Sequence, residues 1–295
     1  MKTQSGFNTD TVNWHKGIDL GHVTPPHYSA CPDAIETYRR DGVALLRGVF
    51  DDWVTRLRDG LQRNLDNPQA FAFPCESNPE GEPGRFFDSY CNWQFIPEYQ
   101  AFVTQSVAAS IAGQFMDTRY AQFFHDHAFS KAPGTQQATP WHQDMPYYCI
   151  EGWKTASVYV SLDAVDKEVA LRFVRGSHRW NTLYYPRVFE DGRHFNEDAR
   201  SDMELTPDID AASDEFDILT WALQPGDAIV FDFRTLHGTS AAEVTSPRRA
   251  FSTRWVGDDA VYSDAPGETS PPYRNHGMRA GDPLREDWFP VLWRR

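Results

Sequence analysis

Cysteine is scarce in this chain of 295 residues, which contains only four, and they lack the close spacing of a metal or redox motif. We therefore expect Cys31, Cys75, Cys91 and Cys149 to be reduced thiols, as is usual in the cytoplasm. No stretch has the roughly 20 apolar residues of a membrane-spanning helix, and the first eight residues show no signal-peptide pattern. These absences predict a cytoplasmic protein without a membrane partner.

Positive charge is also in short supply, because 28 Lys and Arg stand against 42 Asp and Glu, giving a formal charge of -14. This balance argues against nucleic acid or an anionic membrane surface as the main partner. It does not argue against a small-molecule substrate, since the binding of such a molecule depends on the charges of its own pocket. The sequence does not predict an oligomeric state.

Apolar and aromatic residues, in contrast, are plentiful at 40% and 14% of the chain, enough for a sizeable core. We expect one domain over residues 1–295, beginning with an irregular arm at 1–32 and a helix-rich part at 33–117. Within that part, helices are predicted at 33–40, 51–64 and 97–115, a strand at 42–50 and a loop at 65–95.

From residue 118 to 256 the pattern changes to short alternating runs separated by turn residues. Strands are predicted at 123–129, 154–163, 171–174, 218–222, 228–233 and 249–256. The second of these alternates cleanly, with Ala156 and Val158 on one face and Ser157 and Tyr159 on the other. Such antiparallel strands predict a mostly β fold with flanking helices around a jelly-roll core. An acidic, patternless insertion covers 181–216, and we expect the tail at 257–295 to pack on the core.

Two stretches indicate a metal site. His142 and Asp144 are two residues apart, so an extended backbone directs both side chains to one side. His237 follows a predicted strand, and Arg248 comes eleven positions later. Two imidazoles and one carboxylate are the ligand set that suits non-haem Fe(II) and dioxygen. On the residues alone, a surface His-x-Asp pair and a structural histidine at a strand end remain an equal alternative.

Several further motifs occur in a fixed order: Lys131-Ala132-Pro133-Gly134-Thr135, Trp141-His142-Gln143-Asp144, Arg175-Gly176-Ser177-His178, Pro225-Gly226-Asp227, His237-Gly238-Thr239 and Arg248-Arg249-Ala250. Together they resemble the phytanoyl-CoA dioxygenase family from about Tyr38 to the end of the chain. The resemblance implies an oxygenase domain dependent on Fe(II), 2-oxoglutarate and O2, with a double-stranded β-helix core. It also implies that His142, Asp144 and His237 hold the iron. Ala242 and Val244 depart from the family, which often has Asn and Ser there.

The resemblance further implies a cosubstrate site. Arg248 would pair with the distal carboxylate of 2-oxoglutarate, because a guanidinium binds a carboxylate through two parallel hydrogen bonds. Thr239 matches a position whose hydroxyl supports the same carboxylate. His125 matches a position that contacts 2-oxoglutarate in ectoine hydroxylase, and Tyr159 matches an aromatic position beside the cosubstrate. Arg254 shares the face of Arg248 but is six strand residues away, roughly 20 Å, so we expect it not to serve the same carboxylate.

The sequence identifies substrate-binding residues less specifically than metal ligands. His127 and Phe129 alternate with His125 and Lys131 on one strand face. The match of His125 to ectoine hydroxylase then implies that His127 lies beside the substrate, and that Phe129, where that relative has a polar side chain, could supply only an apolar wall. Structural histidines and core packing are the alternatives. Other candidates for the substrate wall are Tyr147, Tyr148, Trp153, Arg172 and Trp180. We interpret His178 as part of a structural turn.

The predicted function is therefore hydroxylation of a small organic metabolite at an unactivated carbon, with release of succinate and CO2. The same ligands would allow desaturation, epoxidation or cyclisation, whereas the presence of Asp144 argues against halogenation. Two other classes remain: a jelly-roll binding protein or pseudoenzyme, and a cupin-like metalloenzyme without a cosubstrate. Arg248 argues against the latter, because such an enzyme needs no carboxylate anchor there.

Overall fold

A computed structural model describes residues 20, 23–68, 73–76, 81 and 83–295 of the protein. The predicted N-terminal arm at 1–32 lies mostly outside the described residues. Helices occur at α1 (Pro32–Asp41), α2 (Val54–Asp66), α3 (Pro97–Gln105) and α4 (Ala108–Phe115). Strands are β1 (Val43–Leu46), β2 (Phe73–Glu76), β3 (Phe86–Tyr90), β4 (Tyr120–Lys131), β5 (Ile150–Glu151), β6 (Thr155–Ser161), β7 (Arg172–Val174), β8 (Ile218–Thr220), β9 (Ala228–Phe231), β10 (His237–Gly238), β11 (Arg248–Val256), β12 (Val261–Tyr262) and β13 (Val291–Arg294).

Two antiparallel sheets form the core. The larger sheet has the order β1-β9-β6-β11-β4-β3-β2, with β13 also paired to β4, and the smaller has the order β10-β7-β8. The inner faces pack on each other, as where the rings of Phe173 and Phe231 lie 5.2 Å apart. A separate two-stranded sheet is formed by β12 and β5. This arrangement confirms the predicted jelly roll.

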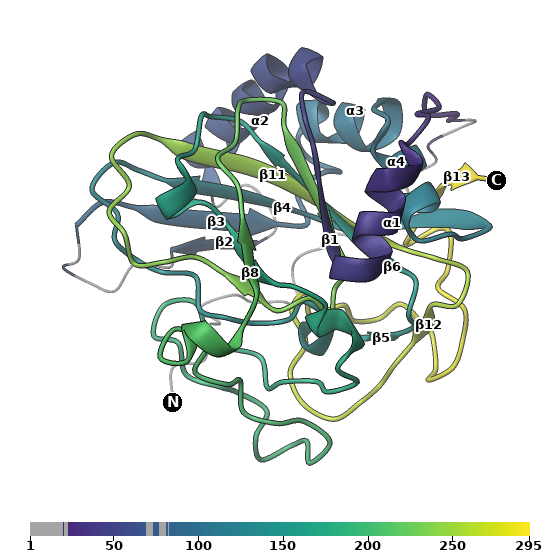
Figure 1. Ribbon diagram of the computed structural model, residues 1–295. Coiled ribbons are helices and arrows are strands. Elements are labelled where there is room, and N and C mark those ends of the chain that lie inside the picture. Colours follow the sequence, from purple (N-terminus) through teal and green to yellow (C-terminus); the bar gives the residue numbers. More distant parts are fainter. Residues whose placement is uncertain (1–19, 21–22, 69–72, 77–80, 82) are drawn as a thin grey trace.

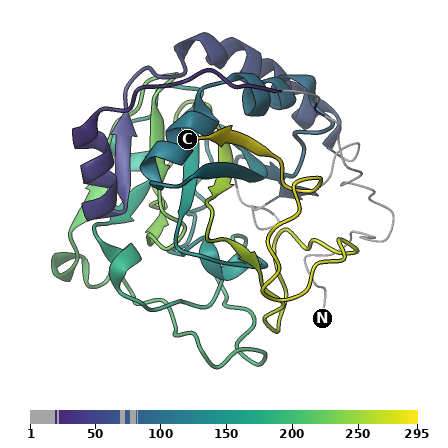
Figure 2. The same ribbon diagram turned by 90° about the vertical axis from the view of Figure 1, so that its right-hand side faces the viewer.

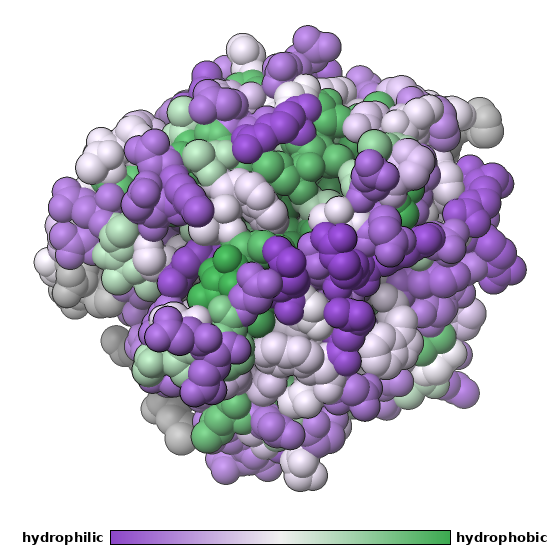
Figure 3. All heavy atoms as spheres, viewed as in Figure 1, coloured by the Kyte–Doolittle hydropathy of each residue, from purple (hydrophilic) through white to green (hydrophobic). Residues whose placement is uncertain are grey.

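The helices cover the outer face of the larger sheet, and long irregular segments lie on the opposite side of the molecule (Figures 1 and 2). Ala156, Val158 and Val160 of β6 join the helix-facing core, while Tyr159 belongs to the core between the sheets. The alternation predicted over 154–163 is therefore confirmed. Tyr99 of α3 stacks on Phe251 of β11 with ring centroids 4.2 Å apart. On the face in Figure 3, hydrophilic residues predominate and hydrophobic ones gather in the upper middle.

Three predictions about local structure were wrong or incomplete. The helix expected at 97–115 is two helices, because Ser106 adopts an extended backbone and its Oγ accepts a hydrogen bond from the Ala108 amide. The loop expected at 65–95 contains β2 and β3, and β3 pairs along β4. The insertion at 181–216 has little regular structure but buries Tyr184, Val188 and Ile209.

The C-terminal tail packs on the core and also extends the sheet. Its last strand, β13, pairs with the start of β4. There Trp293 lies against α4 at Gly113, where an added Cβ would come within 2.1 Å of the indole ring. Glycine is therefore needed at this contact.

Candidate metal centre and its pocket

The predicted metal triad is assembled from two distant segments, one with His142 and Asp144 and the other with His237. His142 and His237 form a two-residue antiparallel bridge in which each backbone amide donates to the other's carbonyl at 2.9 Å. Asp144 immediately precedes the short helical turn Met145–Tyr147. Within the described part of the chain, these three buried residues are the group able to hold a metal, with ligand atoms all within 4.8 Å of one another. Nε2 of His142 and of His237 lie 3.7 Å and 3.8 Å from Asp144 Oδ1.

Backbone carbonyls set the orientation of both imidazoles. Nδ1 of His142 lies 2.8 Å from the Pro140 carbonyl, and Nδ1 of His237 lies 2.9 Å from that of Thr235. Since a carbonyl only accepts, each Nδ1 carries the proton and each Nε2 presents a lone pair to the centre of the triad. Burial, with the neighbouring His237, lowers the pKa of His142 to about 3, and burial also lowers the pKa of His237. Both rings are therefore in the neutral form that binds metals.

The carboxylate of Asp144 is divided between two functions. Its Oδ2 accepts hydrogen bonds from Ser157 Oγ and Arg254 Nε, each at 3.0 Å, which leaves Oδ1 facing the imidazoles. Burial alone would raise the pKa of Asp144, but the charge of Arg254 opposes burial, and the pKa lies well below its usual range. An ionised carboxylate and two neutral imidazoles fit a divalent iron ion, and the remaining coordination positions are free for exogenous ligands.

A second pole of the pocket is positively charged. Arg248 and Lys131 are directly paired across β11 and β4. Lys131 Nζ donates to the carbonyl of Gln137 at 2.7 Å and to Thr239 Oγ1 at 3.3 Å. No carboxylate forms an ion pair with either cation among the residues that the structure describes. Two buried cations that no carboxylate contacts directly are suited to binding an anion such as a carboxylate.

Lys131 is the residue that sequence reasoning missed here. Its strand face was predicted correctly, but its position opposite Arg248 depends on the register between two strands far apart in the chain. Thr239 lies behind this lysine, because its hydroxyl contacts Lys131 and accepts from the Thr139 amide at 2.8 Å. Tyr159 lines the pocket and is buried.

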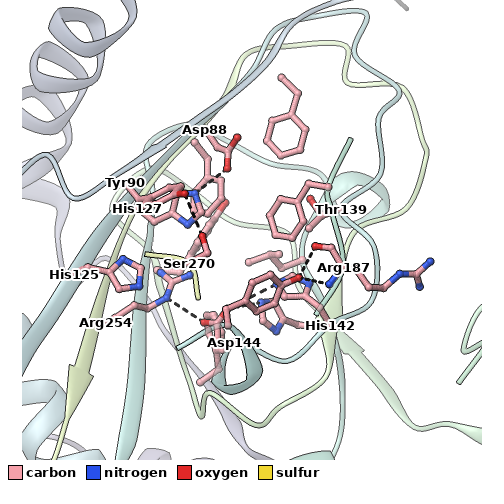
Figure 4. A pocket seen from close by; sticks show the side chains of 18 of the residues that line it. Asp88, Tyr90, His125, His127, Thr139, His142, Asp144, Arg187, Arg254 and Ser270 are labelled. Atoms are coloured by element: carbon pink, nitrogen blue, oxygen red, sulfur yellow. Dashed lines mark hydrogen bonds and ion pairs between the residues drawn. The ribbon is translucent and has the colours of Figure 1, made fainter. Parts of the chain in front are cut away.

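Aromatic side chains form the remaining walls (Figure 4). The predicted residues His127, Phe129, Tyr147 and Tyr148 all line this pocket. His127 Nε2 lies 3.0 Å from Asp88 Oδ2, and its ring packs on Phe129 with centroids 4.0 Å apart. Segments that the sequence did not link to the site add further residues, namely Phe86, Asp88 and Tyr90 from β3, Arg187, Phe189 and Phe195 from the insertion, and Ser270 from the tail.

His125 lies in the pocket next to Arg254. It lines the pocket midway along β4 and is paired in register with Arg254, whereas Lys131 and Arg248 are paired at the end of that strand. Its Nδ1 lies 3.0 Å from the Asp126 carbonyl, while its buried Nε2 has no hydrogen-bond partner. His125 is thus separate from the Lys131–Arg248 pair, and its predicted contact with 2-oxoglutarate stays a prediction.

Three of the predicted substrate-wall residues are not in the pocket. Arg172 lies over the Trp141 ring, 4.8 Å from its centroid, and pairs with Asp210 at 2.8 Å. Trp180 is 39% exposed and packs against Phe216, and Trp153 is 59% exposed beneath Arg234. These predictions were wrong, because a high local density of aromatic and charged residues does not specify which side of the chain faces the cavity. His178 belongs to a short helical turn, as predicted.

The jelly roll, the facial triad and the cationic pole together define a non-haem iron oxygenase that uses 2-oxoglutarate. The model of the family described as phytanoyl-CoA dioxygenase (PhyH) matches residues 38–250, and the chain belongs to this family. Iron, 2-oxoglutarate and O2 are accordingly its cofactor and cosubstrates. None of the curated proteins compared with the chain matches it.

Solved structures similar to this one share its fold. The epimerase SnoN from nogalamycin biosynthesis, in complex with Fe3+, alpha ketoglutarate and nogalamycin RO, has a TM-score of 0.68 at 19% identity, covering 88% of this chain and 98% of its own. The carbocyclase SnoK from the same biosynthesis has a TM-score of 0.67 at 20% identity, covering 91% and 99%. EctD from S. alaskensis, with 2-oxoglutarate and 5-hydroxyectoine, has a TM-score of 0.63 at 15% identity, covering 92% and 95%. No helix among the described residues is long and apolar enough to cross a membrane.

Proposed function

We propose that this protein hydroxylates a small organic molecule at an unactivated carbon, using Fe(II), O2 and 2-oxoglutarate and releasing succinate and CO2. The observation that carries the proposal is the coexistence of an intact His142, Asp144 and His237 triad with a cationic pole in one pocket. A metal-binding module would need only the triad. A second anchor for a carboxylate is what a dicarboxylate cosubstrate requires.

Each residue has a role in this proposal. His142, Asp144 and His237 hold the metal, which when bound supplies the oxidising chemistry together with O2 and 2-oxoglutarate. Arg248 and Lys131 bind the distal carboxylate of the cosubstrate, with Thr239 orienting the lysine and Tyr159 forming the wall beside it. Asp144 provides a negative charge toward the metal, and the neutral imidazoles complete the ligand set.

The substrate would lie between β3 and β4 on one side and the insertion on the other. His127, held by Asp88, offers a polar contact, and Phe129, Tyr147, Phe189 and Phe195 exclude water around it. Rings on both sides favour a substrate with an apolar or aromatic body. Tyr148 and His125 border this region next to Arg254.

We also infer a cytoplasmic location, which the free thiols of Cys31, Cys91 and Cys149 support.

Epimerisation or ring formation is the second candidate outcome. It is favoured by the carbocyclase SnoK and the epimerase SnoN, whose folds this chain shares across nearly all of their length. The same residues would serve, because the outcome depends on which substrate carbon is presented to the metal.

The test begins with anaerobic addition of Fe(II) and 2-oxoglutarate, followed by the visible absorption band of the metal-bound cosubstrate and, after oxygen is admitted, by substrate-independent succinate release. We expect both signals in the native protein and neither in His237→Ala. A binding protein or pseudoenzyme would release no succinate. A metalloenzyme without a cosubstrate would bind iron, and Arg248→Ala would leave its turnover unchanged. A positive result justifies screening metabolites by 2-oxoglutarate consumption and product mass.

A further inference from the structure

Arg254 is a buried arginine at the metal centre. Its side chain is 5% exposed and its Nε lies 3.0 Å from Asp144 Oδ2 and 3.2 Å from the Tyr148 hydroxyl. Nη1 donates to Ser252 Oγ, so the guanidinium is held from two sides. It therefore lies beside Asp144 (Figure 4). It is on the same strand as Arg248 but toward the opposite end.

Stability alone does not account for this ion pair. Removing two charges from water costs several kcal/mol per ion, and replacing a buried pair by apolar residues is often neutral or stabilising. The pair is therefore better explained by what it does to the carboxylate. A carboxylate can bind a metal through one oxygen or through both. Here Oδ2 already accepts two hydrogen bonds, from Arg254 and from Ser157, and only Oδ1 faces the histidines.

We propose that Arg254 is a positioning residue that restricts Asp144 to ligation through Oδ1 and so keeps one more coordination position open for the cosubstrate. Ser157, the register partner of Arg254 on the neighbouring strand β6, also donates to Oδ2 and so restricts Asp144 in the same way. The inference rests on the proposed function only in requiring that the triad holds a metal. It does not depend on the substrate.

Arginine is suited to this task in a way that lysine is not. Its planar fork lets Nε bind Asp144 while Nη1 is fixed by Ser252, so the donor direction toward Oδ2 is set. A lysine ammonium would keep the charge but lose the second attachment. Charge and geometry can therefore be separated by mutation.

The experiment is a Co(II) titration of the metal-free protein, followed by the Co(II) absorption spectrum and by 2-oxoglutarate titration of the Co(II) form. For Arg254→Met we expect Co(II) affinity to fall by about 10- to 100-fold, the usual effect of losing an outer partner of a metal ligand. We also expect a changed spectrum and weaker 2-oxoglutarate binding, because the freed Oδ2 competes for a coordination position. Arg254→Lys should retain more affinity than Arg254→Met while still showing the altered spectrum.

Arg249→Met is the matched control. Arg249 is the neighbour of Arg248 on the same strand but points to the other face, where it pairs with Asp163 at 2.7 Å. It should match the native protein in Co(II) affinity and spectrum. Ser157→Ala, which removes only one donor to Oδ2, should shift both measurements in the same direction by a smaller factor.

The inference is overturned if folded Arg254→Met binds Co(II) within about twofold of the native protein with an unchanged spectrum. If that variant does not fold, native values in both Arg254→Lys and Ser157→Ala overturn it equally. Failure of the proposed function is a different result, because the native protein itself would then bind Co(II) without any response to 2-oxoglutarate.

Discussion

Lys131 and Arg248 occupy directly opposed positions on β4 and β11, and both side chains are buried at the same end of the pocket. Like charges directly opposite on neighbouring strands destabilise a sheet. Burial, together with the charge of Arg248, lowers the pKa of Lys131 well below its usual range. The arrangement is thus unfavourable until an anion binds, which supports the proposal that this end anchors the cosubstrate.

Replacing either cation should separate ligand binding from stability. We expect Arg248→Met to raise the dissociation constant for 2-oxoglutarate by about 30-fold or more, since removing one partner of a buried charge pair costs about 2–5 kcal/mol. Lys131→Met should have a smaller effect on binding but stabilise the ligand-free protein by up to about 1 kcal/mol, because the repulsion is relieved. Titration of the Co(II) form and urea unfolding of the ligand-free form measure the two effects, with Arg249→Met as the control. Unchanged 2-oxoglutarate binding in both variants would contradict the assigned anchor.

The ion pair of Asp144 and Arg254 should show strong coupling in the metal-free protein. Asp144→Ala leaves a buried guanidinium without its counter-charge, and we expect it to lower the free energy of unfolding by about 3–5 kcal/mol. Adding Arg254→Met to Asp144→Ala should restore part of this loss. Urea unfolding of the two single variants and the double variant at pH 7.5 forms the mutant cycle. Additive effects of the two substitutions would mean that the charges do not interact.

Acid should destabilise the metal-free protein partly through His125. Burial, and then the charge of Arg254, lower the pKa of His125 well below its usual value. The unfolded chain takes up the proton near pH 6.5 whereas the folded protein does not. The contribution of neutral His125 to the free energy of unfolding is therefore complete above pH 6.5 and is lost as the pH falls. One such group contributes a slope of about 1.4 kcal/mol per pH unit. In His125→Gln, the free energy of unfolding should fall less steeply with decreasing pH between 7.5 and 5, by about that amount. Parallel profiles would show that His125 protonates in the folded state.

The insertion should be attached to the pocket through Tyr147. Its hydroxyl donates to the Arg187 carbonyl at 2.7 Å and accepts from the Arg187 amide at 2.8 Å. Tyr147→Phe keeps the ring but leaves both backbone groups unpaired, at a cost of about 1–3 kcal/mol for a buried group. Hydrogen exchange over residues 186–195 should therefore accelerate, while Co(II) affinity stays unchanged. Trp180→Ala, which changes an exposed ring outside the pocket, is the control and should not alter exchange in this segment. Equal exchange in Tyr147→Phe and the native protein would remove this residue as the attachment.

Much of the fold and the metal ligands could be predicted from the sequence. Alternation in 154–163 indicates which side chains face the helices and which face the interior, since neighbouring residues on a strand point to opposite sides. His142 and Asp144 lie together because they are two residues apart. Their connection with His237 came from the order of several motifs and not from any local pattern.

The tertiary structure decided the rest. Periodicity identifies the face of a strand but not its register with a partner, so the pairing of Lys131 with Arg248 and the position of His125 beside Arg254 were not readable. Asp88 and Phe195 lie in segments without a pattern and reach the pocket only through packing. The distance along the strand between Arg248 and Arg254 excluded Arg254 as a partner of the same 2-oxoglutarate carboxylate. It did not show that the Arg254 side chain reaches Asp144. Local chemistry thus determined which residues could bind a metal, whereas contacts between distant segments determined what surrounds it, because register and packing are properties of the whole chain.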